Sequence, residues 1–123
     1  MRYFVTGTDT GVGKTEVSLA LLGLMRDRGL APFALKPYQS GGGDDAKRLG
    51  AQVVYRFRLP LAPGVAAELE GVEPSMKAAL AAIPKRGAGV VEGAGGLYVP
   101  IDQEHDVIDL IEAAKLPVVL VAR

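Results

Sequence analysis

The stretch Gly7-Thr8-Asp9-Thr10-Gly11-Val12-Gly13-Lys14-Thr15 connects a short apolar segment to an amphipathic one. The residues before it, Tyr3-Phe4-Val5-Thr6, have the pattern of a buried strand. After it, apolar residues recur at the spacing of one helix face, at Val17, Ala20, Leu21, Leu24 and Met25. The glycine-rich stretch is therefore predicted to lie at a strand-to-helix turn, which is the setting of a phosphate-binding loop.

The residue types in this stretch fit the binding of a polyphosphate. Glycines let backbone N–H groups point into one concavity, and the positive end of the following helix adds to their field. Lys14 would bring a full charge to the outer phosphates, and Thr15 would offer its hydroxyl to a magnesium ion. The standard formula places four residues between its first glycine and its Gly-Lys-Thr, whereas five residues separate Gly7 from Gly13. An ordinary glycine-rich turn is the alternative, and it would make this order of residues a coincidence.

Composition limits the class of protein. The 123 residues are the length of one domain, and a hydrophobic content of 49% is sufficient for a core. Equal numbers of basic and acidic residues give a net charge of zero, so no basic field predicts binding to nucleic acid or to an anionic membrane. Cysteine is absent, no secretory leader opens the chain, and no apolar stretch reaches the roughly 18 residues of a membrane span. We therefore expect a cytoplasmic protein with small-molecule partners.

Strands and helices are expected to alternate along the rest of the chain. The first helix should end near Arg26 to Gly29, with Gly29 as a left-handed C-cap. Further strands are predicted at 33–36, 90–92 and 118–122, loops at 37–43 and 93–96, and an irregular stretch at 52–71. Helices are predicted at 45–49 with Asp44 as cap, from Pro74 with proline in the first position, and after Asp106 as cap.

This alternation predicts an α/β fold with a doubly wound, mainly parallel sheet and helices on both faces. Residues 1–123 are expected to form a single nucleotide-binding domain of the P-loop NTPase type. Right-handed crossovers would place the loops after the first three strands at one edge of the sheet, in one crevice. The run 118–122, counted as the fourth strand, is apolar on both faces. It is expected either to be an edge prone to association or to continue into elements absent from this sequence.

Charged side chains at the ends of the second and third strands are candidates for chemistry. Lys36 is placed to hold an anion or to stabilise charge on a transferring phosphoryl group, with a surface lysine as an equal alternative. Glu92 is expected to hold magnesium or its water shell, because a buried acid without a cation partner would be costly. Asp45 can supply another ligand, whereas Asp44 is better explained as a helix cap.

Two other polar residues carry weaker signals. Ser40 fits a turn better than a site when its position alone is considered. The lone histidine, His105, is expected to be a solvent-exposed loop residue without a catalytic role.

Taken together, these loops resemble those of dethiobiotin synthetases. The matching segments are 3–10, Gly13-Lys14-Thr15, Lys36-Pro37 with Ser40-Gly41, Asp45-Ala46, and 91–96 with Pro100. The five-residue gap in the phosphate loop is that family's own form. The resemblance runs over the whole sequence but covers only about the first half of the family, whose later segments hold the adenine base. Gly11 departs from many relatives, which carry a larger and often acidic residue there.

The resemblance implies an ATP- and magnesium-dependent ligase that forms dethiobiotin from 7,8-diaminononanoate and carbon dioxide in biotin biosynthesis, through a phosphorylated carbamate. It also implies a homodimer. Lys36 would be the catalytic residue, and Thr15, Asp45 and Glu92 would hold Mg²⁺. The residues implied in ATP binding are Gly11, Val12, Gly13, Lys14, Thr15, Glu16, Asp45, Glu92, Gly93, Ala94 and Gly95, and those implied in substrate binding are Thr10, Ser40 and Gly96.

Three other functions stay open at this point. A related amidoligase domain acting on cobyrinic acid would share the sheet and the loops, but the Lys36-Pro37 and 93–96 segments argue against it. A partitioning-type ATPase switch usually carries a lysine early in the phosphate loop, where this sequence has Thr8, Asp9 and Thr10. A non-catalytic nucleotide-binding fragment is the third alternative.

Overall fold

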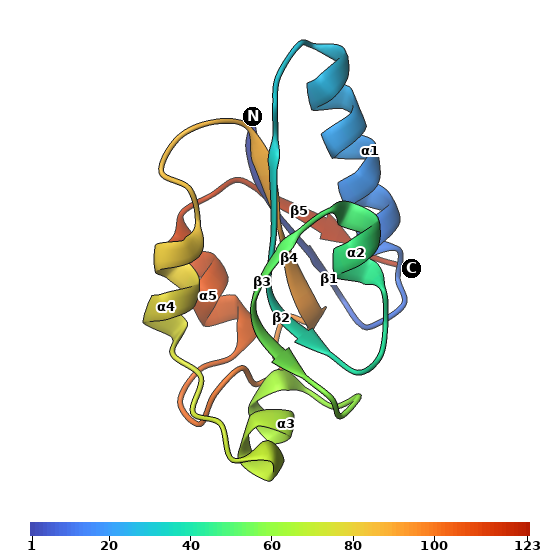
Figure 1. Ribbon diagram of the computed structural model, residues 1–123. Coiled ribbons are helices and arrows are strands. Elements are labelled where there is room, and N and C mark those ends of the chain that lie inside the picture. Colours follow the sequence, from blue (N-terminus) through green and yellow to red (C-terminus); the bar gives the residue numbers. More distant parts are fainter.

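The computed structural model describes all 123 residues and contains one five-stranded sheet (Figure 1). The strands are β1 (Arg2–Gly7), β2 (Phe33–Ser40), β3 (Gln52–Phe57), β4 (Gly89–Gly96) and β5 (Val118–Val121). The helices are α1 (Lys14–Asp27), α2 (Asp45–Leu49), α3 (Pro63–Glu70), α4 (Met76–Ala82) and α5 (Val107–Ala114). The strand order is β3-β2-β4-β1-β5, and every pairing is parallel. The predicted fold class is confirmed.

Alternating side chains along the central strands build a separate core on each face of the sheet. Phe4 and Val91 are buried in a cluster with residues of α3, α4 and α5. Their chain neighbours Val5 and Val90 are buried in a second cluster with residues of α1 and α2. Because successive strand residues point to opposite faces, these apolar runs require helices on both sides, as Figure 1 shows. Burying each such side chain stabilises the fold by about 1.5–3 kcal/mol.

The stretch 52–71, predicted to be irregular, in fact contains β3 and α3. β3 pairs only with β2 and is mostly half-exposed, so it lacks the continuous apolar run of a buried strand. Its aromatic residues instead form a stack, in which Tyr55 lies 5.7 Å from Tyr38 and 6.4 Å from Phe57 between ring centroids. α3 begins at Pro63 and ends at Glu70, and its C-cap Gly71 adopts the left-handed conformation. The final strand is therefore the fifth strand and not the fourth.

Two strands extend beyond their predicted ends. β2 continues to Ser40, although Pro37 was predicted to begin a loop. The ladder with β4 covers only Phe33 to Leu35, so Pro37 lies beyond it and removes no hydrogen bond on that side. β4 continues to Gly96 through the predicted 93–96 loop, with a register shift between the pairs Val5–Glu92 and Gly7–Gly96. This irregularity is a bulge of small residues at the end of β4 that lies over the crevice.

The helix ends agree with the sequence in part. Gly29 is left-handed after α1, and Asp106 forms a capping box with Asp109 at the start of α5. Asp44 occupies the N-cap position of α2, but its side chain makes no capping hydrogen bond. The prediction that α4 starts with Pro74 is wrong, because the Ser75 hydroxyl accepts a hydrogen bond from the Ala78 N–H at 3.2 Å and so sets the helix start. None of the five helices has the length and hydrophobicity needed to cross a membrane.

The loop between β4 and α5 is fixed by an aspartate and histidine pair. Asp102 Oδ1 accepts hydrogen bonds from the backbone N–H groups of Glu104 and His105, both at 2.7 Å, and its Oδ2 lies 2.8 Å from His105 Nδ1. His105 is a loop residue as predicted, and its side chain is 34% exposed where it pairs with this carboxylate. Burial opposes ionisation of Asp102, but its hydrogen bonds outweigh burial and lower its pKa. The hydrogen bond to Asp102 raises the pKa of His105, and Asp109 and Glu104 add to it.

The Asp102–His105 pair should make stability depend on pH. The raised pKa of His105 contributes stability that is full below its ordinary value of 6.5 and is lost as the pH rises through the folded value. The lowered pKa of Asp102 contributes stability above 3.8 that is lost on acidification. His105→Gln should therefore lower the unfolding midpoint more at pH 5.5, inside this window, than well above it. Urea unfolding at both pH values measures this difference, and an equal loss at the two would contradict the charged pair.

The last strand, β5, is an edge strand beside β1. Its outward residues Val118 and Leu120 are 48% and 54% exposed. A parallel edge with unpaired backbone groups and exposed apolar side chains favours pairing with another chain.

We therefore expect the chain to associate with rising concentration, and we expect Leu120→Lys to shift it toward the monomer, because a charged edge residue opposes strand pairing. Light scattering across a concentration series measures this shift. Leu69→Lys is the matched control, because Leu69 is 65% exposed on α3 and lies away from the edge. Equal association of the wild type and Leu120→Lys would exclude β5 as the contact.

Candidate functional site

The segment between β1 and α1 has the geometry of a phosphate-binding loop. Gly11 and Gly13 have φ angles of 75° and 107°, which disfavour residues with a side chain. Gly7 is constrained differently, because an added Cβ would lie 2.7 Å from Val12 Cγ2. Gly13 is the N-cap of α1 and provides no capping side chain, so the first N–H groups of the helix are free to bind an anion.

Lys14 and Thr15 open α1, and both are buried. The Lys14 ammonium donates a hydrogen bond to the Asp9 carbonyl at 2.9 Å, which holds its side chain back over the loop. Burial, followed by repulsion from Lys36, lowers the pKa of Lys14. A bound polyphosphate would offset both effects, because it brings negative charge to two cations that are otherwise close together.

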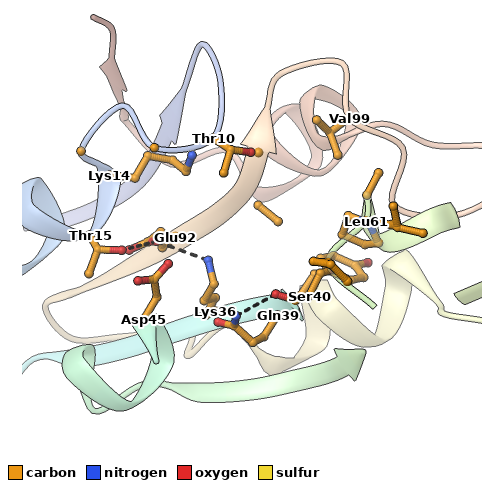
Figure 2. A pocket seen from close by; sticks show the side chains of 18 of the residues that line it. Thr10, Lys14, Thr15, Lys36, Gln39, Ser40, Asp45, Leu61, Glu92 and Val99 are labelled. Carbon is orange, nitrogen blue, oxygen red and sulfur yellow. Dashed lines mark hydrogen bonds and ion pairs between the residues drawn. The ribbon is translucent and has the colours of Figure 1, made fainter. Parts of the chain in front are cut away.

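Glu92 is the centre of the polar cluster (Figure 2). Its carboxylate is 1% exposed, and Oε1 accepts hydrogen bonds from the Thr15 hydroxyl at 3.0 Å and from Lys36 Nζ at 3.3 Å. Lys36 Nζ also donates to the Gly93 carbonyl at 3.4 Å. A buried ion pair is weak evidence for stability. Its presence on two internal strands, beside the phosphate loop, therefore indicates a functional site.

The same cluster fits a magnesium ion. Glu92 Oε2 is buried without a hydrogen-bond partner, and Asp45 lines the same end of the cavity as Thr15 and Lys36 (Figure 2). No group of three or more histidine, cysteine, aspartate or glutamate side chains in the chain is arranged to hold a metal by itself. Mg²⁺ keeps waters and usually binds one or two carboxylates together with phosphate oxygens, so the available hydroxyl and carboxylates are a suitable donor set.

A cavity of about 470 Å³ joins these residues. Its charged end holds Lys14, Thr15, Lys36, Asp45 and Glu92, and its other end is walled by apolar residues that include Leu61 and Val99 (Figure 2). The predicted site residues that line it are Thr10, Gly11, Gly13, Lys14, Thr15, Glu16, Lys36, Ser40, Asp45, Glu92, Ala94 and Gly95. The structure thus brings together the phosphate loop, the start of α1, β2, α2 and β4, which are far apart in the sequence.

Three predicted residues do not line this cavity. Val12 packs over Gly7, at the back of the phosphate loop. Gly93 packs against Phe4, and only its carbonyl reaches the site, through Lys36. Gly96 lies against the loop backbone, where an added Cβ would be 2.7 Å from the Thr8 carbonyl oxygen. The glycines at 93 and 96 therefore allow close packing of β4.

Sequence reasoning missed part of the cavity wall. The residues it did not single out are Tyr38, Gln39, Arg48, Pro60, Leu61, Ala62, Pro63 and Val99. Arg48 forms an ion pair with Glu16 between α2 and α1, and both side chains are largely exposed. A charge pattern on the short helix was the available signal for Arg48, whereas 60–63 follow a strand that was not predicted. His105 does not line the cavity, as expected.

Comparisons with known proteins agree with this geometry. The family model described as an AAA domain matches residues 1–123. The chain is 46% identical to an ATP-dependent dethiobiotin synthetase of Anaeromyxobacter sp. (strain K), over 98% of this chain and 62% of that protein. It is 46% identical to a biotin biosynthesis bifunctional protein of Bordetella avium (strain 197N), over 98% of this chain and 27% of that protein. It is 38% identical to an ATP-dependent dethiobiotin synthetase of Haloferax mediterranei, over 98% of this chain and 58% of that protein.

The chain thus spans about three fifths of the length of the dethiobiotin synthetases that it matches. The resemblance indicated by the sequence motifs is confirmed, and the chain belongs to the AAA domain family.

Proposed function

We propose that this chain is the phosphate-binding part of an ATP- and Mg²⁺-dependent ligase that closes a cyclic urea on 7,8-diaminononanoate with carbon dioxide. The observation that carries the proposal is the buried Lys36–Glu92–Thr15 cluster beside the phosphate loop. The similarity to dethiobiotin synthetases supports it.

The reaction divides into three bond-making steps. One amine of the substrate adds to carbon dioxide and loses a proton, giving a carbamate. A carbamate oxygen then takes the γ-phosphoryl group of ATP and releases ADP. The second amine attacks the activated carbonyl carbon and loses a proton, and the C–O bond breaks as inorganic phosphate leaves with its electron pair. Phosphorylation is required because a carbamate anion is a poor electrophile.

The side chains of the cluster have distinct roles in this scheme. Lys36 stabilises the carbamate and the negative charge on its phosphorylated form, because its buried ammonium acts in a low-dielectric site. Glu92 holds Lys36 in place through the 3.3 Å contact and keeps a second oxygen free. Lys14 and the free amides at the start of α1 bind the triphosphate. Thr10 and Ser40, on opposite walls of the cavity, bind the substrate.

A magnesium ion held by Thr15, Asp45 and Glu92 would neutralise charge on the phosphate oxygens during transfer. The orphaned Glu92 Oε2 supports this assignment. We further propose that the protein acts as a homodimer in the cytoplasm.

Lys14→Ala should weaken Mg-ATP binding by at least about tenfold, because a charge-assisted contact to phosphate contributes about 1.5–3 kcal/mol. Isothermal titration calorimetry measures the change in affinity. Lys77→Ala is the control, because Lys77 is an exposed lysine on α4, outside the cavity. Unchanged affinity in Lys14→Ala would contradict the phosphate-loop assignment.

Lys36→Ala should lower turnover by about 10² or more while leaving the affinity for Mg-ATP nearly unchanged, because Lys36 acts on charge that develops during phosphoryl transfer. Release of ADP under saturating substrate, together with the dissociation constant of Mg-ATP, separates the two effects. Lys85→Ala provides an exposed lysine for comparison. An equal loss of affinity and turnover would make Lys36 a nucleotide ligand, and our division of roles would be wrong.

A further inference from the structure

Unsatisfied buried polar atoms gather at the cavity. Six buried side-chain oxygens in the structure have no hydrogen-bond partner, and four of them belong to residues that line the cavity: Tyr38, Gln39, Ser40 and Glu92. Buried polar atoms are nearly always paired in folded proteins, so a concentration of unpaired atoms marks a place where a ligand completes the hydrogen bonding. Three of the four lie on consecutive residues of β2, next to Lys36 and beyond it toward the apolar end.

The chemistry at Gln39 is the most restricted of the three. Its Nε2 donates a hydrogen bond to the Ser40 carbonyl at 3.1 Å. A flipped amide would place two acceptor oxygens against each other there, so this contact fixes which atom faces the other way. Oε1 is therefore the free atom, and it can only accept. The residue is 3% exposed, and it lines the cavity.

The cavity otherwise presents donors and metal ligands to a substrate. Lys14 and Lys36 carry ammonium donors, and the carboxylates of Asp45 and Glu92 are assigned to the cation. The Ser40 hydroxyl can donate or accept, so it does not select between ligands. The Tyr38 hydroxyl has the same two possibilities, so Gln39 Oε1 is the one unpaired oxygen of β2 that can only accept, and Figure 2 shows the Gln39 side chain adjacent to Lys36 and Ser40.

We infer that Gln39 is a specificity-determining residue whose carboxamide oxygen accepts a hydrogen bond from an amino group of the substrate. This inference rests on the proposed function for the identity of that substrate. An N–H donor would satisfy the orphaned oxygen, whereas a hydrocarbon would leave it unpaired and a carboxylate would be repelled by it. Gln39 thus selects for the amine and leaves the binding of ATP to the phosphate loop.

Two substitutions separate this role from a structural one. Gln39→Met keeps the length of the side chain and removes both polar atoms, whereas Gln39→Asn keeps the carboxamide, with its acceptor oxygen and its N–H donor, on a side chain that is one methylene shorter. Calorimetric titrations with 7,8-diaminononanoate, with 1,2-diaminopropane and with Mg-ATP are compared for wild type and both variants. Gln52→Met is the control, because Gln52 is an exposed residue at the start of β3.

We expect Gln39→Met to weaken diaminononanoate binding by about tenfold or more, because it leaves an N–H donor unpaired, and we expect a smaller loss in Gln39→Asn, which keeps the acceptor oxygen. Affinity for Mg-ATP should change by less than about threefold in every variant, since Gln39 is outside the phosphate loop. Nonanoate, which lacks both amino groups, should bind wild type at least about tenfold more weakly than the diamine, which tests the inference without any substitution.

The outcomes distinguish failure of the inference from failure of the proposed function. Equal diamine affinity in wild type and Gln39→Met, or equal loss in both variants, overturns the role of the acceptor and leaves the proposed function standing. If wild type binds 1,2-diaminopropane but not diaminononanoate, and the variants still differ, the acceptor role stands and the proposed substrate is wrong. Binding of Mg-ATP without binding of either amine overturns both.

Discussion

The ion pair between Glu92 and Lys36 is the interaction on which the site depends. A carboxylate that is 1% exposed requires a partner, because the desolvation of an unpaired charge costs several kcal/mol. The strand order supplies that partner on both sides. β4 lies between β1 and β2, so Glu92 at its end meets Thr15, which follows β1, and Lys36, which belongs to β2. Any other order of these three strands would leave the carboxylate without one of its two contacts.

The stability of the fold and the chemistry of the site make opposite demands on these residues. Each half of the core is satisfied by apolar packing, with Phe4 and Val91 on one face and Val5 and Val90 on the other. Within β2 and β4 and at the start of α1, the fold buries three charged side chains, those of Lys36, Glu92 and Lys14, and leaves Glu92 Oε2 unpaired. Well-packed apolar residues there would be at least as stable. Buried charges and an unpaired carboxylate oxygen at one end of the sheet therefore indicate a ligand site.

The sequence predicted the phosphate loop and its helix because both are encoded locally, in the spacing of Gly7, Gly13 and Lys14 and in the helical period that follows. It also predicted that Lys36 and Glu92 share one edge, since parallel strands bring their carboxyl ends together. It could not predict β3, whose half-exposed residues are ordered by the stack of Tyr55 against Tyr38 and Phe57. The contact of Tyr55 with Tyr38 joins β3 to β2, and no periodicity along one strand records it. Gln39 was not predicted as a strand residue because Pro37 was taken as the start of a loop. β2 continues past Pro37 through its pairing with β3, after its pairing with β4 has ended at Leu35.

The two ends of the cavity consequently differ in how freely they can change. The charged end depends on the exact backbone path of the loop, where an added Cβ on Gly7 or Gly96 would meet atoms at 2.7 Å. The apolar end is built by connecting segments such as 60–63, which follow an edge strand and tolerate changes in length. The alignment with the Anaeromyxobacter sp. (strain K) relative spans 138 positions against the 123 residues of this chain, so that relative carries additional residues within the matched region. Connections are the places that can hold them, because an insertion between Gly7 and Lys14 would destroy the anion site. The charged end of the cavity is thus fixed by the loop and the sheet, whereas the shape of the apolar end follows from connections.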